Sequence, residues 1–505
     1  MKKILYCLTC LLMLASCGES LFDTYKDYAG DGEIRFVGKV KELTASPGWQ
    51  CIRLKWVNGT DPIIDQVEVK WTSENVSDSV LLPAGTDNYQ ISNLVSGSNY
   101  EVSVMSVDKN MHQSVATTAY VRPYNADHEA VQAFTRLVSR NFFLHNHLLL
   151  TFIGWDANVK EAYLTYTAKS SGEQKRYDLT EEVVNKLHVD IPDVDATKPV
   201  QVHRSGYIEG CEDLINFDPI ALDVEPVYNS EFKTEMKRMF GYDETIPEEW
   251  RTSTTSLDLD WSASDVADLL YLPNLKKLYL GRNRYVRADQ VDDTEKGQSQ
   301  LTDNDLSIWV LDRLHELNGL EVYRYDKHFS KLPSRSYIHD MGHHAEPQLN
   351  FVSMKGAKVS VMPAESDELI SMGWKSHEEY LIDGKVSTSW MPYSQKSSTT
   401  YTITVELPKA YKVKGMRLVQ SYYDEANAAQ RALNPSQIRV YKSANGSYYP
   451  LATNLEDTNI GSSTGEVNYI PFADDSAVQF IRIELTTPMY FSYFQVSLAE
   501  LGFYE

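Results

Sequence analysis

The sequence predicts a mainly β protein with tandem β-sandwiches, a short leucine-rich α/β segment and a C-terminal jelly-roll-like sandwich. Two patterns support this fold class. Apolar and polar residues alternate with a period of two over residues 34–123 and 351–505, and a leucine pattern recurs from residue 254 to residue 322. The chain has 505 residues, of which 42% are hydrophobic and 23% charged. This is enough for several domains, each with a core of its own.

The N-terminus is typical of a secreted and lipid-anchored protein. Two lysines precede an apolar run over residues 4–15, which is too short to span a bilayer and typical of a signal peptide. The run ends in Leu14-Ala15-Ser16-Cys17, which resembles the lipobox of bacterial lipoproteins. The resemblance implies a signal peptide over 1–16, lipidation of Cys17 and a tether over 17–33, at the cell outer membrane. The alternative is an ordinary secretory signal with a chance cysteine.

Residues 34–125 predict a first sandwich. The inward faces of two strands are predicted to carry Ile52, Leu54, Trp56, Val67, Val69 and Trp71. A leucine, a turn glycine and Tyr100, which opens an alternating strand, resemble the tyrosine corner of a fibronectin type III domain. The start of this region also resembles an uncharacterised N-terminal domain of Bacteroidota surface lipoproteins. That family implies a location more than an activity.

Residues 126–225 predict a second, immunoglobulin- or fibronectin-like sandwich, with strands over 147–155, 161–167 and 199–203. Once the leader is removed, only Cys51 and Cys211 remain besides the anchor cysteine. They fall in different predicted domains. We therefore expect neither a disulfide framework nor a cysteine metal site.

Residues 226–335 change in character. Residues 275–283 fit LxxLxLxxN, the strand pattern of leucine-rich repeats, and weaker copies start at 254 and 317. The starts differ by 21 and 42 residues, which is one and two repeats. The polar stretch over 284–305 is interpreted as an insertion, and residues 336–350 as a linker.

Residues 351–505 predict a string of strands, over 401–407, 413–419, 437–441, 478–485 and 497–504. The segment Ile382-Asp383-Gly384 through Thr388-Ser389-Trp390 resembles the "IDG…TSW" segment of the discoidin, or coagulation factor V/VIII type C, fold. Four later segments resemble strands of that family in the same order. The resemblance covers roughly a third of the chain. It implies a module that on bacterial surface proteins commonly binds carbohydrate and often carries a structural calcium ion.

The same resemblance implies the residues of a Ca²⁺ site. The family uses the Asp of "DG", the Thr before "SW" and the Glu of the final "AEL", which are Asp383, Thr388 and Glu500 in this sequence. Hard oxygen ligands of this kind suit calcium. The alternative is that Asp383 only forms the turn and Glu500 caps a strand.

A carbohydrate site needs aromatic faces and hydrogen-bonding groups on loops of a rigid scaffold. The loop after Val419 and the loop before the last strand offer both. The candidate ligand contacts are Tyr422, Tyr423, Arg431, Asn434, Tyr490, Phe491 and Tyr493. Arg431, Asn434 and Phe491 match by region the arginine, asparagine and late-loop aromatic residue that the family uses. The alternative is that Tyr422 and Tyr493 pack beneath the loops.

Charge and motifs narrow the function. Acidic residues outnumber basic ones by 70 to 48, so a nucleic-acid partner is not expected. Residues 461–465 match GxSxG but join two β segments, where no nucleophile elbow forms. The sequence therefore predicts a non-catalytic surface lipoprotein that binds glycan for polysaccharide capture, in the company of an outer-membrane transporter. The alternative is a protein-interaction or adhesion scaffold that uses the sandwiches and the leucine-rich segment.

Overall fold

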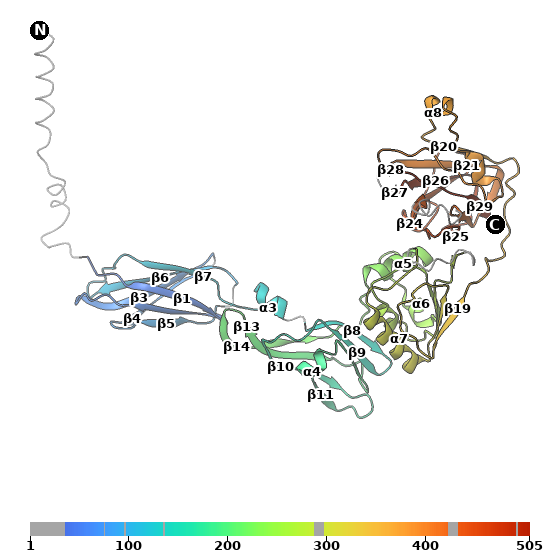
Figure 1. Ribbon diagram of the computed structural model, residues 1–505. Coiled ribbons are helices and arrows are strands. Elements are labelled where there is room, and N and C mark those ends of the chain that lie inside the picture. Colours follow the sequence, from blue (N-terminus) through green and yellow to red (C-terminus); the bar gives the residue numbers. More distant parts are fainter. Residues whose placement is uncertain are drawn as a thin grey trace, which may run out of the picture.

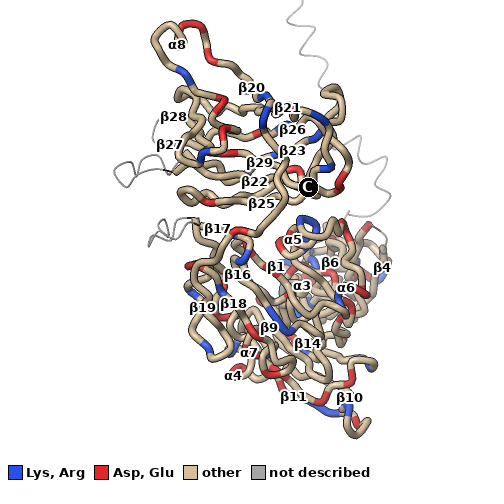
Figure 2. The backbone as a smooth tube through the Cα atoms, turned by 90° about the vertical axis from the view of Figure 1, so that its right-hand side faces the viewer, with Lys and Arg blue, Asp and Glu red and all other residues tan. Residues whose placement is uncertain are grey.

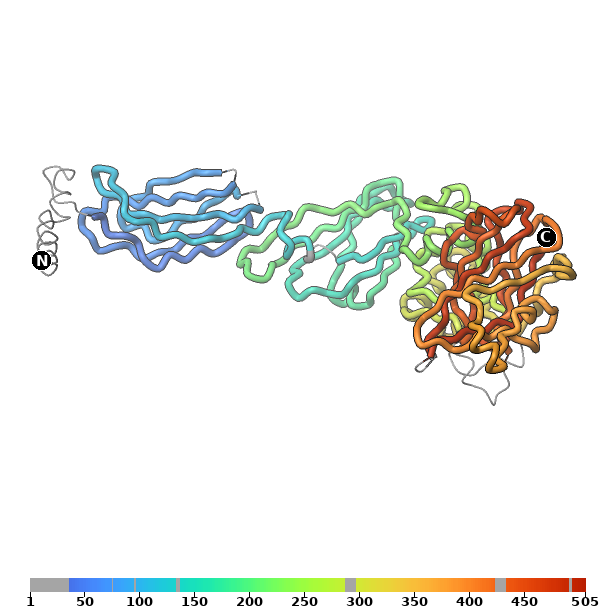
Figure 3. The backbone as a smooth tube through the Cα atoms, turned by 90° about the horizontal axis from the view of Figure 1, so that it is seen from above, coloured from blue at the N-terminus to red at the C-terminus, as the bar shows by residue number. Residues whose placement is uncertain are grey.

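The computed structural model describes residues 36–74, 76–94, 97–134, 137–286, 297–422, 433–490 and 493–505. Within these ranges four units follow one another, and Figures 1 and 3 show the first sandwich and the C-terminal domain at opposite ends of an elongated array. The predicted leader, tether and lipidated Cys17 lie outside the described residues. Among the residues described, no helix is both long and apolar enough to cross a membrane.

The first unit is an antiparallel β-sandwich. One sheet has the order β1-β2-β5 and the other β4-β3-β6-β7. All six predicted inward residues are buried, and Trp56 and Tyr100 keep only 2% and 1% of their surface exposed. Alternation with a period of two thus placed the core faces correctly. The strands are β1 (Lys41–Gly48), β2 (Cys51–Val57), β3 (Ile64–Thr72), β4 (Ser77–Pro83), β5 (Asn88–Ile91), β6 (Tyr100–Asp108) and β7 (Thr117–Val121).

The second unit is also a sandwich, with sheets β12-β9-β8 and β11-β10-β13-β14. Leu148, Leu150 and Leu164 lie in its core. The elements are α3 (Glu129–Phe134), β8 (Val138–Leu144), β9 (His147–Phe152), β10 (Val159–Thr167), β11 (Gln174–Asp178), α4 (Glu181–Val184), β12 (His188–Ile191), β13 (Gln201–Ile208) and β14 (Cys211–Ala221).

The two sandwiches are joined by direct contacts. The Asp213 carboxylate accepts a hydrogen bond from the Trp49 backbone N–H at 2.9 Å and forms an ion pair with Arg53. The Tyr124 hydroxyl donates to the Glu209 carbonyl oxygen at 3.0 Å. Hydrogen bonds and an ion pair therefore link the two sandwiches directly. Cys51 and Cys211 are both buried free thiols.

The third unit is built on a parallel sheet of order β15-β16-β18-β19, with Leu257, Leu278 and Val322 side by side in register and buried. Helix α7 and the 3-10 helix η1 pack their apolar residues into the same core. The elements are α5 (Ser230–Phe240), α6 (Glu248–Ser253), β15 (Ser256–Leu259), η1 (Ala267–Tyr271), β16 (Lys277–Leu280), α7 (Asn304–Asn318), β18 (Glu321–Tyr325) and β19 (Ile338–Gly342).

Two details of this unit differ from the sequence prediction. The first two strands are offset by 21 residues, as predicted, but Lys277 pairs with Glu321, an offset of 44 instead of 42. Helix α7 runs to Asn318 and ends with Gly319 in the left-handed conformation, so the strand starts later than the leucine pattern suggests. The predicted linker over 336–350 contains β19, which pairs with β18 as a fourth parallel strand.

The C-terminal domain is a sandwich of two antiparallel sheets, β20-β21-β26-β23-β24 and β17-β25-β22-β29, in which β17 covers Arg284–Tyr285. All five predicted strand segments contain a strand, and Trp390, 1% exposed, packs in the core. The elements are β20 (Lys358–Met362), α8 (Asp367–Ser371), η3 (Glu378–Ile382), β21 (Thr400–Lys412), β22 (Gly415–Val419), β23 (Gln437–Ser443), β24 (Thr458–Asn459), β25 (Val467–Pro471), β26 (Ala477–Thr486), β27 (Met489–Tyr490), β28 (Tyr493–Phe494) and β29 (Glu500–Tyr504).

The third unit contributes a strand to this domain. Strand β17 (Arg284–Tyr285) pairs with β25, so the polar stretch interpreted as an insertion begins as an edge strand of the C-terminal sandwich. Arg284 forms an ion pair with Glu466, and their side chains are only 4% and 0% exposed. Glu346 adds a second link, since it accepts hydrogen bonds from Arg417 at 2.7 Å and from the Tyr469 hydroxyl at 2.7 Å. The third unit and the C-terminal domain are therefore joined by direct contacts between their described residues.

Candidate functional site

The three predicted calcium ligands lie together at one turn. Asp383 directly follows the 3-10 helix η3, and Glu500 is the first residue of strand β29. The Thr388 hydroxyl donates to Asp383 Oδ2 at 3.0 Å, and the Gly384 backbone N–H donates to Glu500 Oε2 at 3.1 Å. The fold therefore brings together residues that are more than a hundred positions apart in the sequence.

Burial sets the electrostatics of this turn. Glu500 is 7% exposed, and its burial, together with the negative charge of Asp383, raises the pKa of its carboxyl to about 8. No three His, Cys, Asp or Glu side chains converge on a metal position in the described part of the chain. A bound ion would rest on two carboxylates, the Thr388 hydroxyl and backbone oxygens. An all-oxygen set of this kind fits Ca²⁺, and such an ion would stabilise the ionised form of the buried Glu500 carboxyl.

The predicted ligand contacts are distributed unevenly. Tyr423, Arg431 and Phe491 lie outside the described residues. Tyr422 directly follows β22 and is partly buried, and Tyr490 pairs with Tyr493 in the β27–β28 hairpin. Tyr493 is 55% exposed. Of the candidates whose side chains are described, Tyr493 alone is well exposed to solvent.

Asn434 differs from its predicted role. Its side chain is 5% exposed, and its Nδ2 donates to the carbonyl oxygens of Ser462 at 3.2 Å and Ser463 at 3.4 Å. The amide therefore fastens the turn that holds the GxSxG match and points into the domain. A short polar side chain next to orphaned turn carbonyls is drawn inward because buried carbonyl groups need donors.

A pocket of about 290 Å³ opens between the α8 loop and the segment after Trp390. Its lining includes Glu365, Ser376, Glu378, Tyr393 and Gln395. Tyr393 is 43% exposed, and its ring meets that of Trp374 edge-on at 5.3 Å. The volume is close to the lower end of small-ligand pockets, about 300 Å³.

The polar groups of this pocket are only partly satisfied. Glu365 Oε2 accepts a hydrogen bond from the Ser376 backbone N–H at 3.2 Å, whereas Glu365 Oε1 is buried with no partner among the described residues. Burial raises the pKa of Glu378, and the charge of Glu365 adds to this effect. A buried acceptor without a donor costs about 1–3 kcal/mol unless a water or ligand hydroxyl supplies one.

The pocket lies at the end of the domain where the loop before the last strand was predicted to bind carbohydrate. Gln395 and Phe494 exchange two backbone hydrogen bonds, of 2.8 and 2.9 Å, which hold the segment after Trp390 against the β27–β28 hairpin. Glu365 and Tyr393 were not among the predicted site residues. The signal that could have found Tyr393 is an aromatic residue three positions after the "TSW" motif.

Comparison with known proteins agrees with this fold. Residues 17–208 match the model of DUF4998, a domain of unknown function. Residues 362–498 match the model of the F5/8 type C domain. The C-terminal domain therefore has the F5/8 type C fold, as the sequence predicted. No curated protein matches the chain.

Solved structures similar to parts of the chain are distant in sequence. An F5/8 type C domain from Bacteroides fragilis is 14% identical, with 31% of this chain and 96% of that chain covered and a TM-score of 0.25. A family 32 carbohydrate-binding module of a Clostridium perfringens glycoside hydrolase is 18% identical, with 30% and 95% covered and a TM-score of 0.21. Two fibronectin type III domains of chicken tenascin are 14% identical, with 36% and 97% covered and a TM-score of 0.19.

Proposed function

We propose that this protein is a non-catalytic, lipid-anchored protein of the outer membrane that binds carbohydrate with the loop end of its C-terminal domain. The observation that carries the proposal is the pocket beneath the α8 loop, which combines an exposed tyrosine ring with a buried carboxylate oxygen that has no partner among the described residues. A pyranose offers both an apolar C–H face and hydroxyl donors. The Tyr393 ring would pack against the first, and Glu365 Oε1 would accept from the second.

The rest of the chain suits a spacer between membrane and ligand. Cys17 would be anchored in the membrane, and the two joined sandwiches would hold the C-terminal domain away from it (Figure 1). A capture role beside an outer-membrane transporter would need this reach. A structural Ca²⁺ held by Asp383, Thr388 and Glu500 would fix the turn that leads into Trp390 and hence the pocket wall.

Charge favours a neutral or weakly charged glycan. Figure 2 shows Lys and Arg interspersed with Asp and Glu along the described part of the C-terminal domain, without one continuous basic band. A sulfated or uronic-acid polymer binds best to a concentrated cationic surface. Neutral polysaccharides are therefore the first ligands to test.

Replacing Tyr393 by alanine should weaken glycan binding about five- to thirtyfold, since losing a central aromatic contact costs about 1–2 kcal/mol. The measurement is affinity gel electrophoresis of the full chain in neutral polysaccharides, followed by calorimetric titration with the best ligand. Tyr448, which is 76% exposed elsewhere on the same domain, gives the matched control Tyr448→Ala. Equal retardation of the wild type and Tyr393→Ala would contradict this site, and release of reducing ends from the polysaccharide would contradict a non-catalytic role.

One observation favours the alternative of a protein-interaction scaffold. On the face of the parallel sheet opposite its helices, Tyr279, Tyr323 and His339 form a row with ring centroids 5.2 Å apart at each step. Tyrosine is enriched at protein interfaces. Two results together would favour this function. No polysaccharide would retard the wild type in affinity gels, and an outer-membrane protein would co-purify with the wild type but not with Tyr323→Ala.

A further inference from the structure

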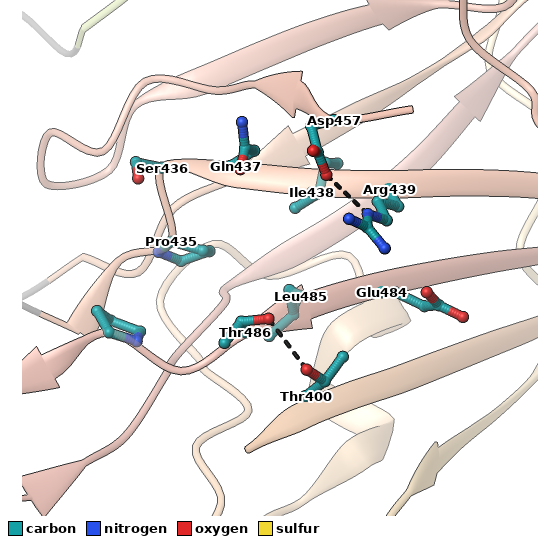
Figure 4. A pocket seen from close by; sticks show the side chains of 11 residues that line it. Thr400, Pro435, Ser436, Gln437, Ile438, Arg439, Asp457, Glu484, Leu485 and Thr486 are labelled. Carbon is teal, nitrogen blue, oxygen red and sulfur yellow. Dashed lines mark hydrogen bonds and ion pairs between the residues drawn. The ribbon is translucent and has the colours of Figure 1, made fainter. Parts of the chain in front are cut away.

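A groove of about 470 Å³, separate from the pocket beneath the α8 loop, lies on the five-stranded sheet (Figure 4). It arises where two strands separate. Strands β23 and β26 pair from Arg439 opposite Glu484 onward, whereas Gln437 and Ile438 of β23 pair only with β24, on the other edge of β23. Strand β26 continues alongside β21 as far as Thr486 opposite Thr400. The wedge between the diverging strands is the groove.

The groove is lined mainly by hydrogen-bonding groups. Arg439 Nε donates to Asp457 at 2.7 Å on one wall, and the hydroxyls of Thr400 and Thr486 lie 3.0 Å apart on the other (Figure 4). Between them lies Glu484, whose carboxylate has no hydrogen-bond or ion-pair partner in the described ranges of the chain. The exposed Gln437 amide completes the polar lining. Such a set can both donate to and accept from vicinal hydroxyls.

The charge of the lining selects among glycans. Two carboxylates, Asp457 and Glu484, face one guanidinium, Arg439, so the groove repels polyanions. Among the described residues that line it, none is aromatic, in contrast to the pocket, where Tyr393 lines the wall. The groove alone would therefore hold a sugar weakly. It would add affinity only to a ligand that is already bound nearby.

The groove and the pocket lie at the same end of the sheet. Thr399 lines the pocket and Thr400 lines the groove. The backbone between the pocket and the groove is held by two hydrogen bonds. The Thr487 N–H donates to the Thr399 carbonyl oxygen at 2.9 Å, and the Thr399 N–H donates to Thr487 Oγ1 at 2.9 Å. Pro488, another groove residue, leads directly into the hairpin that carries the exposed Tyr493. A linear chain that leaves the pocket past this hairpin would reach the groove.

We infer that the groove is a second contact zone for a linear neutral oligosaccharide whose end occupies the pocket. The inference rests on the proposed carbohydrate-binding function. It adds that affinity increases with chain length, because the groove binds later units of a ligand that the pocket has already captured.

The test is calorimetric titration of the full chain with neutral cello-, manno-, xylo- and N-acetylchito-oligosaccharides of one to six units. In the series that binds, the wild type should bind the hexasaccharide about tenfold or more tightly than the disaccharide. Glu484→Ala and Gln437→Ala should abolish that gain and leave disaccharide binding unchanged. The matched control is Glu406→Ala, which should keep the gain; Glu406 is a half-buried glutamate on the same strand as Thr400 and pairs with Lys358.

The outcomes separate this inference from the proposed function. Equal affinity for short and long chains, or equal weakening of both by Glu484→Ala, would overturn the groove and leave the pocket as a glycan site. Loss of the gain in Glu406→Ala as well would also overturn it. If the wild type bound none of these oligosaccharides, both the groove and the proposed carbohydrate-binding function would be overturned.

Discussion

Replacing Arg284 by alanine should destabilise residues 226–505 by about 3–5 kcal/mol, because it leaves the Glu466 carboxylate buried without its cation. Glu466 is fully buried, and Arg284 is its ion-pair partner. The guanidinium also donates to Ser299 Oγ at 2.8 Å and to the Gly297 carbonyl oxygen at 2.7 Å, so its loss removes donors from two more groups. Urea unfolding followed by tryptophan fluorescence measures the effect.

Matched variants separate burial from charge in this prediction. Arg176 forms ion pairs with Glu161 and Asp178 on the exposed surface of the second sandwich, and Arg176→Ala should leave the urea midpoint close to that of the wild type. Changing both partners at the junction, as in Arg284→Met with Glu466→Leu, should recover part of the loss, since no charge is then stranded. An Arg284→Ala protein that unfolds at the wild-type urea concentration would contradict a role of this pair in stability.

The Arg284–Glu466 pair also implies that the C-terminal domain needs the preceding unit for its stability. Removing the residues before 345 would take away β17 and Arg284 together, which exposes the edge of β25 and leaves Glu466 without its partner. An unpaired strand edge favours aggregation. The binding experiments above therefore use the full chain.

The sequence predicted what periodicity encodes and missed what depends on long-range contacts. Alternation placed Trp56, Trp71 and Tyr100 in the first core, and the leucine pattern placed Leu257 beside Leu278. No local sequence pattern indicates that Arg284 belongs to an edge strand of the C-terminal domain. Its partner lies 182 residues later, and it begins a polar stretch that looks like an insertion.

The candidate site shows the same limit. Resemblance to a family predicted that Asp383, Thr388 and Glu500 lie together, because the family's motifs occur in a fixed order along the chain. Glu365 was not predicted, since the path of the α8 loop over the segment after Trp390 follows no period. Asn434 was predicted because it matches by region the asparagine that the family uses, and a match by region does not say whether an amide faces a ligand or a neighbouring turn.

Without a divalent cation, the protein should lose stability as the pH rises from about 5 to about 8. The Glu500 carboxyl has a pKa of about 8 in the folded protein, against an ordinary value of 4.5. Between these values the folded chain keeps a proton that the unfolded chain releases, so raising the pH favours unfolding. The slope from this group is up to about 1.4 kcal/mol per pH unit.

Calcium should remove this slope. An ion held by Asp383, Thr388 and Glu500 stabilises the ionised carboxylate, so the folded chain no longer retains the proton. Urea midpoints at pH 5.5 and pH 8.0, each in EDTA and in millimolar Ca²⁺, measure the effect. The midpoint should fall with pH in EDTA and should rise on addition of Ca²⁺ at pH 8.0 by a larger amount than at pH 5.5.

The variant Glu500→Gln isolates this group from others that titrate in the same range. Burial also raises the pKa of Asp326 to about 6, which adds a slope of the same sign in every variant. Glu500→Gln carries no charge at either pH, so it should show only the remaining slope and no response to Ca²⁺. If Glu500→Gln and the wild type lose stability equally between pH 5.5 and pH 8.0 in EDTA, the buried carboxyl does not titrate in this range. In that case groups of the folded protein already stabilise the ionised Glu500 carboxylate, and this residue does not need Ca²⁺ for that purpose.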